Sequence, residues 1–185
     1  MRKGWLTIPG VQLGDRTVEE QTAALRPAIE TCGGKTILDM GAAEGLIARE
    51  FVRAGAARAI CLESVGDHIA VGLRECAGLP MEFVQCNINE QAADLRFEVD
   101  IVLCLGIAHK MHEPQRAIDL AARSARELVL IRSGRGADAN GIIRAKHRGA
   151  TCDSHATMKA AGFVLERVEV GPPPHSEPVE FWRKA

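Results

Sequence analysis

The segment that most constrains the fold runs from Thr36 to Glu63. Residues 36–45 read Thr-Ile-Leu-Asp-Met-Gly-Ala-Ala-Glu-Gly, an apolar strand that leads into a glycine-containing turn. A stretch with helical character follows, and the next apolar run ends on the carboxylate of Glu63. A strand, a glycine turn, a helix and a second strand that ends on an acid build an adenosine-binding crevice at the carboxyl ends of parallel strands. The segment therefore predicts a parallel α/β sheet that binds an adenosine-containing cofactor.

The glycine spacing in this turn narrows the choice of cofactor. A dinucleotide-binding fingerprint places glycines at relative positions 1, 3 and 6. Here Gly41 and Gly45 stand at positions 1 and 5, whereas Ala43 and Leu46 take positions 3 and 6. The spacing is compatible with a cofactor that contains adenosine but disfavours the dinucleotides NAD and FAD. An NAD-dependent reductase is therefore the weakest functional alternative.

Apolar and helical segments alternate along the middle of the chain. Strands rich in Ile, Val, Leu or Cys are expected at 36–40, 58–63, 81–86, 99–105 and 127–132. Helical stretches are expected between them, at about 45–54, 65–77 and 114–125. Near-continuous apolar strands of this kind are typical of the buried centre of a parallel sheet with helices on both faces.

The C-terminal third changes character. A helix at 152–161 is followed by strands at 163–170 and 178–183, which a Gly-Pro-rich turn joins. With no helix between them, these two strands should pair as an antiparallel hairpin at the sheet edge. We therefore predict an α/β fold with a doubly wound, Rossmann-like sheet of about seven strands, mostly parallel and closed by a C-terminal antiparallel hairpin.

The N-terminal part precedes this alternation. Residues 1–15 have the character of an irregular arm, and Thr17 is a candidate N-cap for a helix over 18–30 that is kinked or restarts at Pro27. A chain of 185 residues fits one domain with its own core. We divide it into an N-terminal arm and helix over 1–34 and an α/β domain over 35–185.

Composition excludes several classes of protein. The chain has 23 Lys and Arg against 24 Asp and Glu, so no overall field draws it to nucleic acid or membrane. It has no tyrosine and 4% aromatic residues, which disfavours an RNA-binding platform based on base stacking. Its six cysteines form no CxxC pair, and it lacks a signal peptide or a membrane-spanning apolar run. These features predict a cytoplasmic protein in a reducing compartment, with no membrane partner.

The order of elements, together with four short segments, resembles the class I S-adenosylmethionine-dependent methyltransferases. The segments are Leu38–Gly45 with its acidic residue and spaced glycines, Glu63, Phe83–Ile88, and Val102–His109 at the fourth strand and its exit. The resemblance covers nearly all of 35–185, and the arm before it is where such enzymes keep a substrate lid. It implies S-adenosylmethionine as the cofactor.

The resemblance also implies a set of cofactor-binding residues. They are Asp39, Gly41, Ala42, Gly45, Glu63, Ser64, Asn87, Ile88, Cys104 and Leu105. Glu63 stands where the family binds the ribose diol, and Asn87 stands where an aspartate usually meets the adenine. As a neutral acceptor, Asn87 should bind more weakly than a carboxylate. Simpler readings stay open: an ordinary βα turn at Gly41, a helix N-terminal charge at Glu63 and a turn residue at Asn87.

The segment after the fourth strand supplies the candidate catalytic group. In the family this exit faces the methyl group, and His109 titrates near neutrality, so His109 is the first candidate for a general base. Lys110 and His112 follow it as candidate substrate contacts. A histidine that only shapes the pocket or caps the next helix is an equal alternative. His109-x-x-His112 and Cys152-x-x-His155 lack further ligands at a recognised spacing, so no metal site is expected.

A basic, glycine-rich stretch gives the clue to the acceptor. Its basic members are Arg132, Arg135, Arg144, Lys146, His147 and Arg148, placed beside the crevice. Such a loop can clamp a phosphate or carboxylate, and Arg132, Arg135 and Arg144 are the named candidates for substrate binding. The N-terminal arm, with Trp5, Arg16 and Gln21, should cover the cofactor or the acceptor. We therefore expect methyl transfer to an anionic small molecule, such as a sugar or other metabolite.

Three alternatives to this function remain, one for the acceptor, one for the loop and one for the activity itself. The loop over 132–148 can instead bind RNA backbone, which would make the chain an RNA methyltransferase. It can also be a solvated flexible loop. Finally, Ala43 and Asn87 in place of the usual glycine and aspartate permit a methyltransferase-like scaffold that binds cofactor without catalysis.

Overall fold

The computed structural model describes residues 2–4, 6–133, 140–146, 149–173 and 177–185. Its centre is a seven-stranded sheet in the order β10-β11-β7-β6-β3-β4-β5. Five strands are parallel: β3 (Thr36–Met40), β4 (Arg58–Glu63), β5 (Met81–Gln85), β6 (Val99–Leu105) and β7 (Ala125–Arg132). The last two, β10 (Phe163–Val170) and β11 (Pro178–Lys184), form an antiparallel hairpin, and β11 pairs with β7. The predicted sheet is confirmed.

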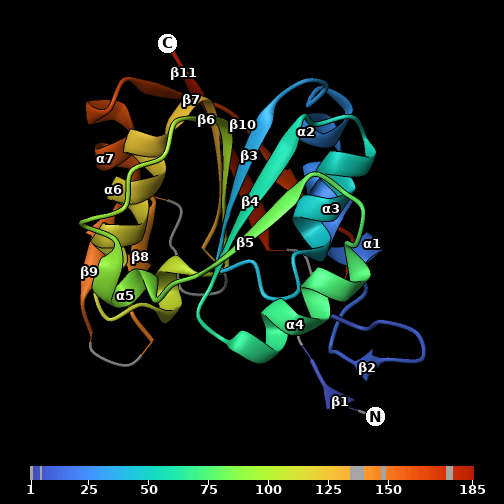
Figure 1. The fold of residues 1–185 in the computed structure, drawn as a ribbon. Helices are drawn as coiled ribbons and strands as arrows, with labels where there is room; N and C mark the ends of the chain where they lie inside the picture. The colour runs from blue at the N-terminus through green and yellow to red at the C-terminus, as the bar shows by residue number, and fades with distance from the viewer. Residues whose placement is uncertain (1, 5, 134–139, 147–148, 174–176) are drawn as a thin grey trace.

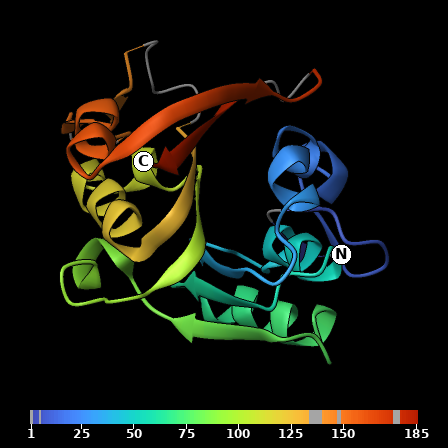
Figure 2. The same cartoon turned by 90° about the horizontal axis from the view of Figure 1, so that it is seen from above.

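Helices cover both faces of this sheet (Figures 1 and 2). One layer holds α1 (Val18–Thr22), the 3-10 turn η1 (Ala23–Leu25), α2 (Arg26–Glu30), α3 (Leu46–Arg53) and α4 (Gly66–Glu75). The other layer holds α5 (Ile88–Gln91), α6 (Pro114–Ser124) and α7 (Ser154–Ala160). The helices expected at 45–54, 65–77, 114–125 and 152–161 are therefore confirmed, with ends that differ by up to two residues.

The alternation of strand side chains divides the core into two apolar clusters. In β3, Leu38 and Met40 join the cluster under α6 and α7, whereas Ile37 joins the cluster under α1 to α3. In β6, Val102 and Cys104 face the first cluster and Leu103 faces the second. Because both faces are covered, successive residues of each strand are buried, and each central strand is a continuous apolar run.

The segment over 18–30 is divided rather than continuous. Thr17 caps α1 as expected: its hydroxyl accepts from the Glu20 N–H at 3.2 Å, and the Glu20 carboxylate accepts from the Thr17 N–H at 2.7 Å. The 3-10 turn η1 then separates α1 from α2, which has Pro27 in its first turn. Proline lacks an N–H and fits only the start of a helix, so the helix restarts there.

Several short elements were not predicted. They are the hairpin of β8 (Ile142–Arg144) and β9 (Thr151–Asp153), the 3-10 turn η2 (Ala108–Lys110), the helix α5, and β1 (Arg2–Lys3) paired with β2 (Gln12–Leu13). Each has two to four residues, too few to show a hydrophobic period.

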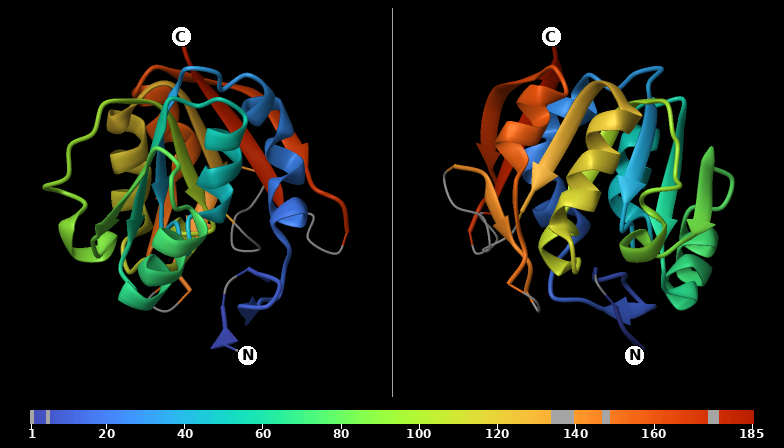
Figure 3. Two further views of the ribbon diagram at one scale, coloured as in Figure 1. Left: turned by 45° about the vertical axis from the view of Figure 1, so that its right-hand side comes forward. Right: turned by 90° about the vertical axis from the view of Figure 1, so that its left-hand side faces the viewer.

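The N-terminal arm packs against the domain instead of projecting from it. Leu6 and Ile8 are 2% and 7% exposed and join the cluster that contains Leu25 and Phe51. Figure 3 shows the arm at the end of the molecule where the parallel strands terminate. Among the described residues, no helix is both long enough and apolar enough to cross a membrane.

Candidate functional site

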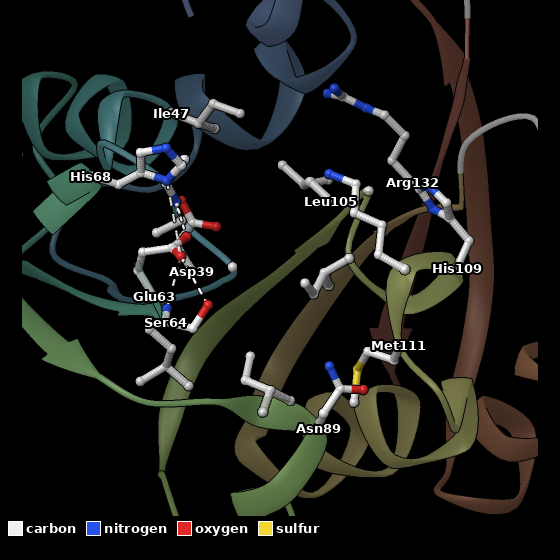
Figure 4. A pocket seen from close by; sticks show the side chains of 18 of the residues that line it. Asp39, Ile47, Glu63, Ser64, His68, Asn89, Leu105, His109, Met111 and Arg132 are labelled. Atoms are coloured by element: carbon white, nitrogen blue, oxygen red, sulfur yellow. Dashed lines mark hydrogen bonds and ion pairs between the residues drawn. The ribbon is translucent and has the colours of Figure 1, made fainter. Parts of the chain in front are cut away.

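A cavity of about 840 Å³ opens at the carboxyl ends of β3, β4, β6 and β7. Figure 4 shows Asp39, Glu63 and His68 on one side of it and His109 and Arg132 on the other. We call Asp39, Glu63, Ser64 and His68 the acidic wall. We call Arg16, His109, Lys110, Arg132, Arg144, Lys146 and Glu177 the basic wall. A volume in this range suits a cofactor together with a small second molecule.

Most of the predicted cofactor residues line this cavity. They are Asp39, Gly41, Ala42, Glu63, Ser64, Asn87, Ile88 and Leu105. Gly45 and Cys104 do not line it. Gly45 has φ +71°, and a Cβ there would lie 2.6 Å from the Phe83 ring, so this glycine lets the turn pack onto β5. Cys104 is fully buried in the core cluster under α6 and α7, and burial raises the pKa of its thiol to about 12.

The glycine turn after β3 is held by backbone hydrogen bonds. The N–H groups of Gly41 and Ala42 both donate to the Leu62 carbonyl, at 2.8 and 2.9 Å. Gly41 has φ +72°, and a Cβ there would lie 2.8 Å from Ile107, so only glycine fits. Ala43 adopts φ +50°, a left-handed conformation that costs an alanine free energy relative to glycine.

Glu63 is fixed by its own neighbours before any ligand binds. One carboxylate oxygen, Oε1, accepts from the N–H groups of Ser64 and Val65 at 2.8 Å each. The other, Oε2, accepts from the Ala43 N–H at 2.8 Å. His68 Nδ1 lies 4.0 Å from Oε1. The carboxylate thus joins the ends of β3 and β4, and Oε2 keeps a lone pair for a further donor.

Asp39 is the second carboxylate of this wall and is 3% exposed. Its Oδ2 has no hydrogen-bond partner among the described residues. Burial, and then the charge of Glu63, raise its pKa to about 7, against the lowering effects of the Ala48 N–H and Arg132. Asp39 also lines the cavity, and a buried carboxyl whose hydrogen bonds are incomplete is stabilised in its ionised form by a cation bound nearby.

Asn87 lines the cavity and also caps α5. Its Oδ1 accepts from the Asn89 N–H at 3.1 Å, and its Nδ2 donates to Glu90 at 2.9 Å. Asn87 therefore has a structural role as the N-cap of α5. Oδ1 retains one lone pair for a ligand.

His109 lies on η2, directly after β6, and is half-buried. Burial, followed by the charges of Lys110 and Lys146, lowers its pKa below the ordinary value, so the imidazole is neutral at physiological pH. Its Nδ1 is buried and has no hydrogen-bond partner in the part of the chain that the structure describes. Lys146 is tethered beside it, because the Lys146 N–H donates to the His109 carbonyl at 2.8 Å.

The other predicted basic residues differ in where they lie relative to the cavity. Lys110 and Arg144 line the cavity. His112 is exposed and does not line it, since η2 turns the chain and the His112 N–H donates to Asn89 at 2.9 Å. Arg135 lies outside the described residues, as do Trp5, His147 and Arg148.

Arg132 is buried at the end of β7, with 7% of its surface exposed. Its guanidinium donates to the Gln21 carbonyl at 2.7 Å and to the Gln21 side-chain oxygen. Burial and the nearby Arg16 lower its pKa to about 10, so it remains charged at neutral pH. Arg132 therefore joins the basic wall to the N-terminal helix.

The arm is tied to the cavity at two more points. Gln12, fully buried, donates from Nε2 to the Leu6 carbonyl and to Glu44 in the glycine turn, both at 2.8 Å. Arg16 forms a two-point ion pair with Glu177, at 2.7 and 3.2 Å. The arm thus reaches both the turn after β3 and the segment before β11.

Sequence reasoning missed several lining residues. They include His68, Cys86, Asn89, Met111, Lys146 as a lining side chain, and Glu177. A signal existed for His68 and Asn89, because each follows the end of a parallel strand by a few residues. None existed for Glu177, whose place depends on the fold of the hairpin. Among the described residues, no group of three or more His, Cys, Asp or Glu side chains is arranged to hold a metal.

Comparison with known proteins gives a likeness of structure and none of sequence. No family model matches the chain, and no curated protein matches it. Among solved structures, magnesium protoporphyrin IX methyltransferase from Synechocystis PCC 6803, with bound S-adenosylmethionine, superposes with a TM-score of 0.69. That likeness covers 91% of this chain and 80% of that chain at 15% identity.

Two further structures show how widely the likeness extends. The 1,6-didemethyltoxoflavin-N1-methyltransferase from Burkholderia thailandensis has a TM-score of 0.62 at 20% identity, over 91% of this chain and 81% of that one. A putative RNA methyltransferase from Pyrococcus horikoshii has a TM-score of 0.58 at 18% identity, over 90% and 82%. The chain has the fold of the class I S-adenosylmethionine-dependent methyltransferases, as its sequence predicted.

Proposed function

We propose that this protein transfers a methyl group from S-adenosylmethionine to an anionic small molecule. The observation that carries the proposal is the cavity with two unlike walls, placed where this fold ends its parallel strands. The acidic wall suits a cofactor that bears a sulfonium and an ammonium. The basic wall suits an acceptor that bears a phosphate or carboxylate.

The acidic wall fits this cofactor in its details. Asp39 lines the cavity and has one carboxyl oxygen without a hydrogen-bond partner among the described residues, so its charge would stabilise the nearby ammonium group. The remaining lone pair of Glu63 Oε2 is available to a ribose hydroxyl. Gly41 lines the cavity, and its positive φ lets the chain turn tightly at the end of β3. When bound, the cofactor supplies the electrophilic methyl group, and the chain's residues supply its placement.

On the basic wall, His109 is the candidate general base. Its lowered pKa keeps the imidazole neutral, so it can take a proton from an acceptor hydroxyl or amine as the methyl bond forms. Lys110, Arg144 and Lys146 line the same side and would orient the acceptor through its anionic group. Placement of the acceptor in line with the methyl would provide much of the rate enhancement.

Calorimetric titration tests the cofactor first. Purified protein is titrated in parallel with S-adenosylmethionine, its demethylated product and NAD. We expect micromolar binding of the two sulfur compounds, no binding of NAD, and loss of binding in Glu63→Ala. Glu82→Ala, which removes an exposed carboxylate from neighbouring β5, is the matched control. Thermal unfolding of Glu63→Ala checks that the variant is folded, and failure of the wild-type protein to bind either compound contradicts the proposal.

The acceptor is tested by formation of the demethylated product with a panel of hydroxyl- and amine-bearing phosphates and carboxylates. Binding of cofactor without turnover on any of them would favour the scaffold alternative. The RNA alternative is supported by the exposure of Arg144 and Lys146 at the rim of the cavity. It predicts affinity for RNA that falls steeply with salt, because each phosphate contact releases a counterion.

A further inference from the structure

The ion pair between Arg16 and Glu177 closes part of the basic wall. Both side chains line the cavity, and they are 18% and 14% exposed. They come from opposite ends of the chain: Arg16 ends the N-terminal arm, and Glu177 directly precedes β11. The pair is bidentate, the geometry in which a guanidinium binds a carboxylate or a phosphate most strongly.

Glu177 belongs to a part of the cavity lining that is rich in positive charge. The charges of Arg16 and Arg132 act on it directly, and Lys110, Arg144 and Lys146 line the same cavity. Its charge acts on its neighbours, since it favours the protonated forms of both His109 and Arg132. Burial opposes ionisation of Glu177 itself, but hydrogen bonds from Arg16 and the backbone, and the charges of Arg16 and Arg132, lower its pKa. Glu177 thus neutralises part of the positive charge of Arg16 and Arg132.

A protein carboxylate in this position occupies the place of a bound oxyanion. We propose that Glu177 holds the anion subsite on Arg16 in the ligand-free protein, and that the acceptor's phosphate or carboxylate binds there by displacing it. This inference rests on the proposed function, because it assigns the group that the anionic acceptor would use. It also separates two kinds of residue: Arg16 binds the acceptor, whereas Glu177 competes with it.

This proposal differs in its consequences from a purely structural latch. If the pair only held the arm in place, loss of Glu177 would loosen Arg16 and weaken anion binding. If Glu177 competes for Arg16, its loss would strengthen anion binding. The sign of the effect therefore distinguishes the two roles.

The test is calorimetric titration of the cofactor-free protein with inorganic phosphate and, separately, with malonate. Glu177→Gln should bind at least one of them about three- to tenfold more tightly than wild type, because no carboxylate then competes. Arg16→Gln should bind about tenfold more weakly. The control is Glu166→Gln, a carboxylate of the same hairpin that pairs with Arg167 and Arg183 on the surface, which should bind like wild type.

A second measurement needs no variant. Saturating phosphate or malonate should increase exchange of the Glu177 amide hydrogen in the wild-type protein, measured in a peptide that begins several residues before Glu177, because this segment is released from Arg16. A preference for phosphate or for malonate would show which oxyanion the acceptor carries.

Unchanged or weaker binding in folded Glu177→Gln would overturn the proposal, as would unchanged exchange at Glu177 under saturation. Because cofactor is absent throughout, this failure is distinct from failure of the proposed function. Loss of cofactor binding would contradict the methyltransferase, whereas loss of the anion effect would contradict the role of Glu177 alone.

Discussion

The acidic and basic walls of the cavity are built in different ways. The acidic wall is local: Asp39 and Glu63 lie one βα unit apart, and backbone N–H groups of Ala43, Ser64 and Val65 fix the Glu63 carboxylate. The basic wall is assembled from the arm, η2, β7, β8 and the segment before β11. Its contacts join side chains that are far apart in sequence, such as Arg16 with Glu177 and Arg132 with Gln21.

This difference suggests a division of labour. A wall fixed by backbone geometry changes little among proteins that share the fold, whereas a wall of long side chains can change its specificity through a few substitutions. The structural neighbours agree with this view in one respect. Their names specify a porphyrin, a toxoflavin precursor and RNA, although they share one fold. Under the proposed function, we expect the acidic wall to determine the cofactor and the basic wall the acceptor.

The largest effect that would test this division is at His109. We expect His109→Ala to reduce kcat about 10²- to 10⁴-fold with an accepted substrate, while the dissociation constant for S-adenosylmethionine stays near the wild-type value. The control is His112→Ala, which removes an exposed imidazole outside the cavity and keeps its backbone bond to Asn89. Steady-state kinetics and calorimetry measure the two quantities. A loss of cofactor affinity with kcat unchanged would mean that His109 binds the cofactor and does not act in catalysis.

The pH dependence of the same reaction follows from the pKa of His109. Because burial and two lysines lower that pKa, the neutral base persists below the ordinary value of about 6.5. The rate should fall only when the pH drops below this lowered pKa, so the acidic limb of kcat/KM should lie below about 6.5. An acidic limb above that value would contradict the role of His109 as the free base.

A smaller effect, confined to the cofactor, is expected at Asp39. Asp39→Asn should weaken S-adenosylmethionine binding about ten- to a hundredfold, because the ammonium group of the cofactor loses its anionic partner. Since the pKa of Asp39 is about 7, binding of a cation near neutral pH should release a proton from it. Calorimetry in buffers of different ionisation enthalpy measures this release, which should vanish in Asp39→Asn and persist in the control Asp94→Asn, an exposed site.

The titration of Asp39 should also affect the stability of the ligand-free protein. The folded pKa of Asp39 is raised to about 7, above an unfolded value of about 3.9. Its contribution to the free energy of unfolding is therefore fully present below about pH 4 and is lost as the pH rises through about 7. The difference in stability between the ligand-free wild type and Asp39→Asn should follow this window. A difference that does not change with pH would mean that the pKa of Asp39 is the same in the folded and unfolded protein.

A moderate effect on stability is expected where the basic wall meets the arm. Arg132→Met should lower the free energy of unfolding by about 2 kcal/mol, because it leaves two buried oxygens of Gln21 without their donor. Arg126→Met, which removes an exposed pair with Asp100, should cost less than about 0.5 kcal/mol. Urea denaturation measures both. Equal costs would mean that Arg132 does not hold the arm.

These two walls also explain how far the sequence could predict the site. Asp39, Gly41 and Glu63 were predicted because each is tied to the end of a strand that its own apolar run reveals. Cys104 does not line the cavity, because successive strand residues alternate between faces and its side chain points into the core. Gly45 does not line it either, and the structure gives that glycine a packing role against Phe83.

The basic wall was harder to predict for a physical reason. Its basic residues were visible in the sequence, but their partners were not, since Glu177 and Gln21 meet them only after the chain has folded. The β8–β9 hairpin, which carries Arg144 into the cavity, has strands of three residues and no readable period. Contacts between distant segments leave no local pattern, so this wall required the structure.

The smallest expected effect is on the stability of the glycine turn that supports the acidic wall. Ala43 adopts φ +50° in the glycine turn, so Ala43→Gly should relieve strain and raise the free energy of unfolding by up to about 1 kcal/mol. The gain is limited because Ala43 is buried, so its methyl group contributes apolar burial that glycine lacks, and because glycine gains more conformational entropy in the unfolded chain. Ala48→Gly, in the buried face of helical α3, should instead lower stability by about 1 kcal/mol. Urea denaturation gives both signs, and equal losses would mean that the turn is unstrained and its shape does not depend on the backbone preference we assign to it.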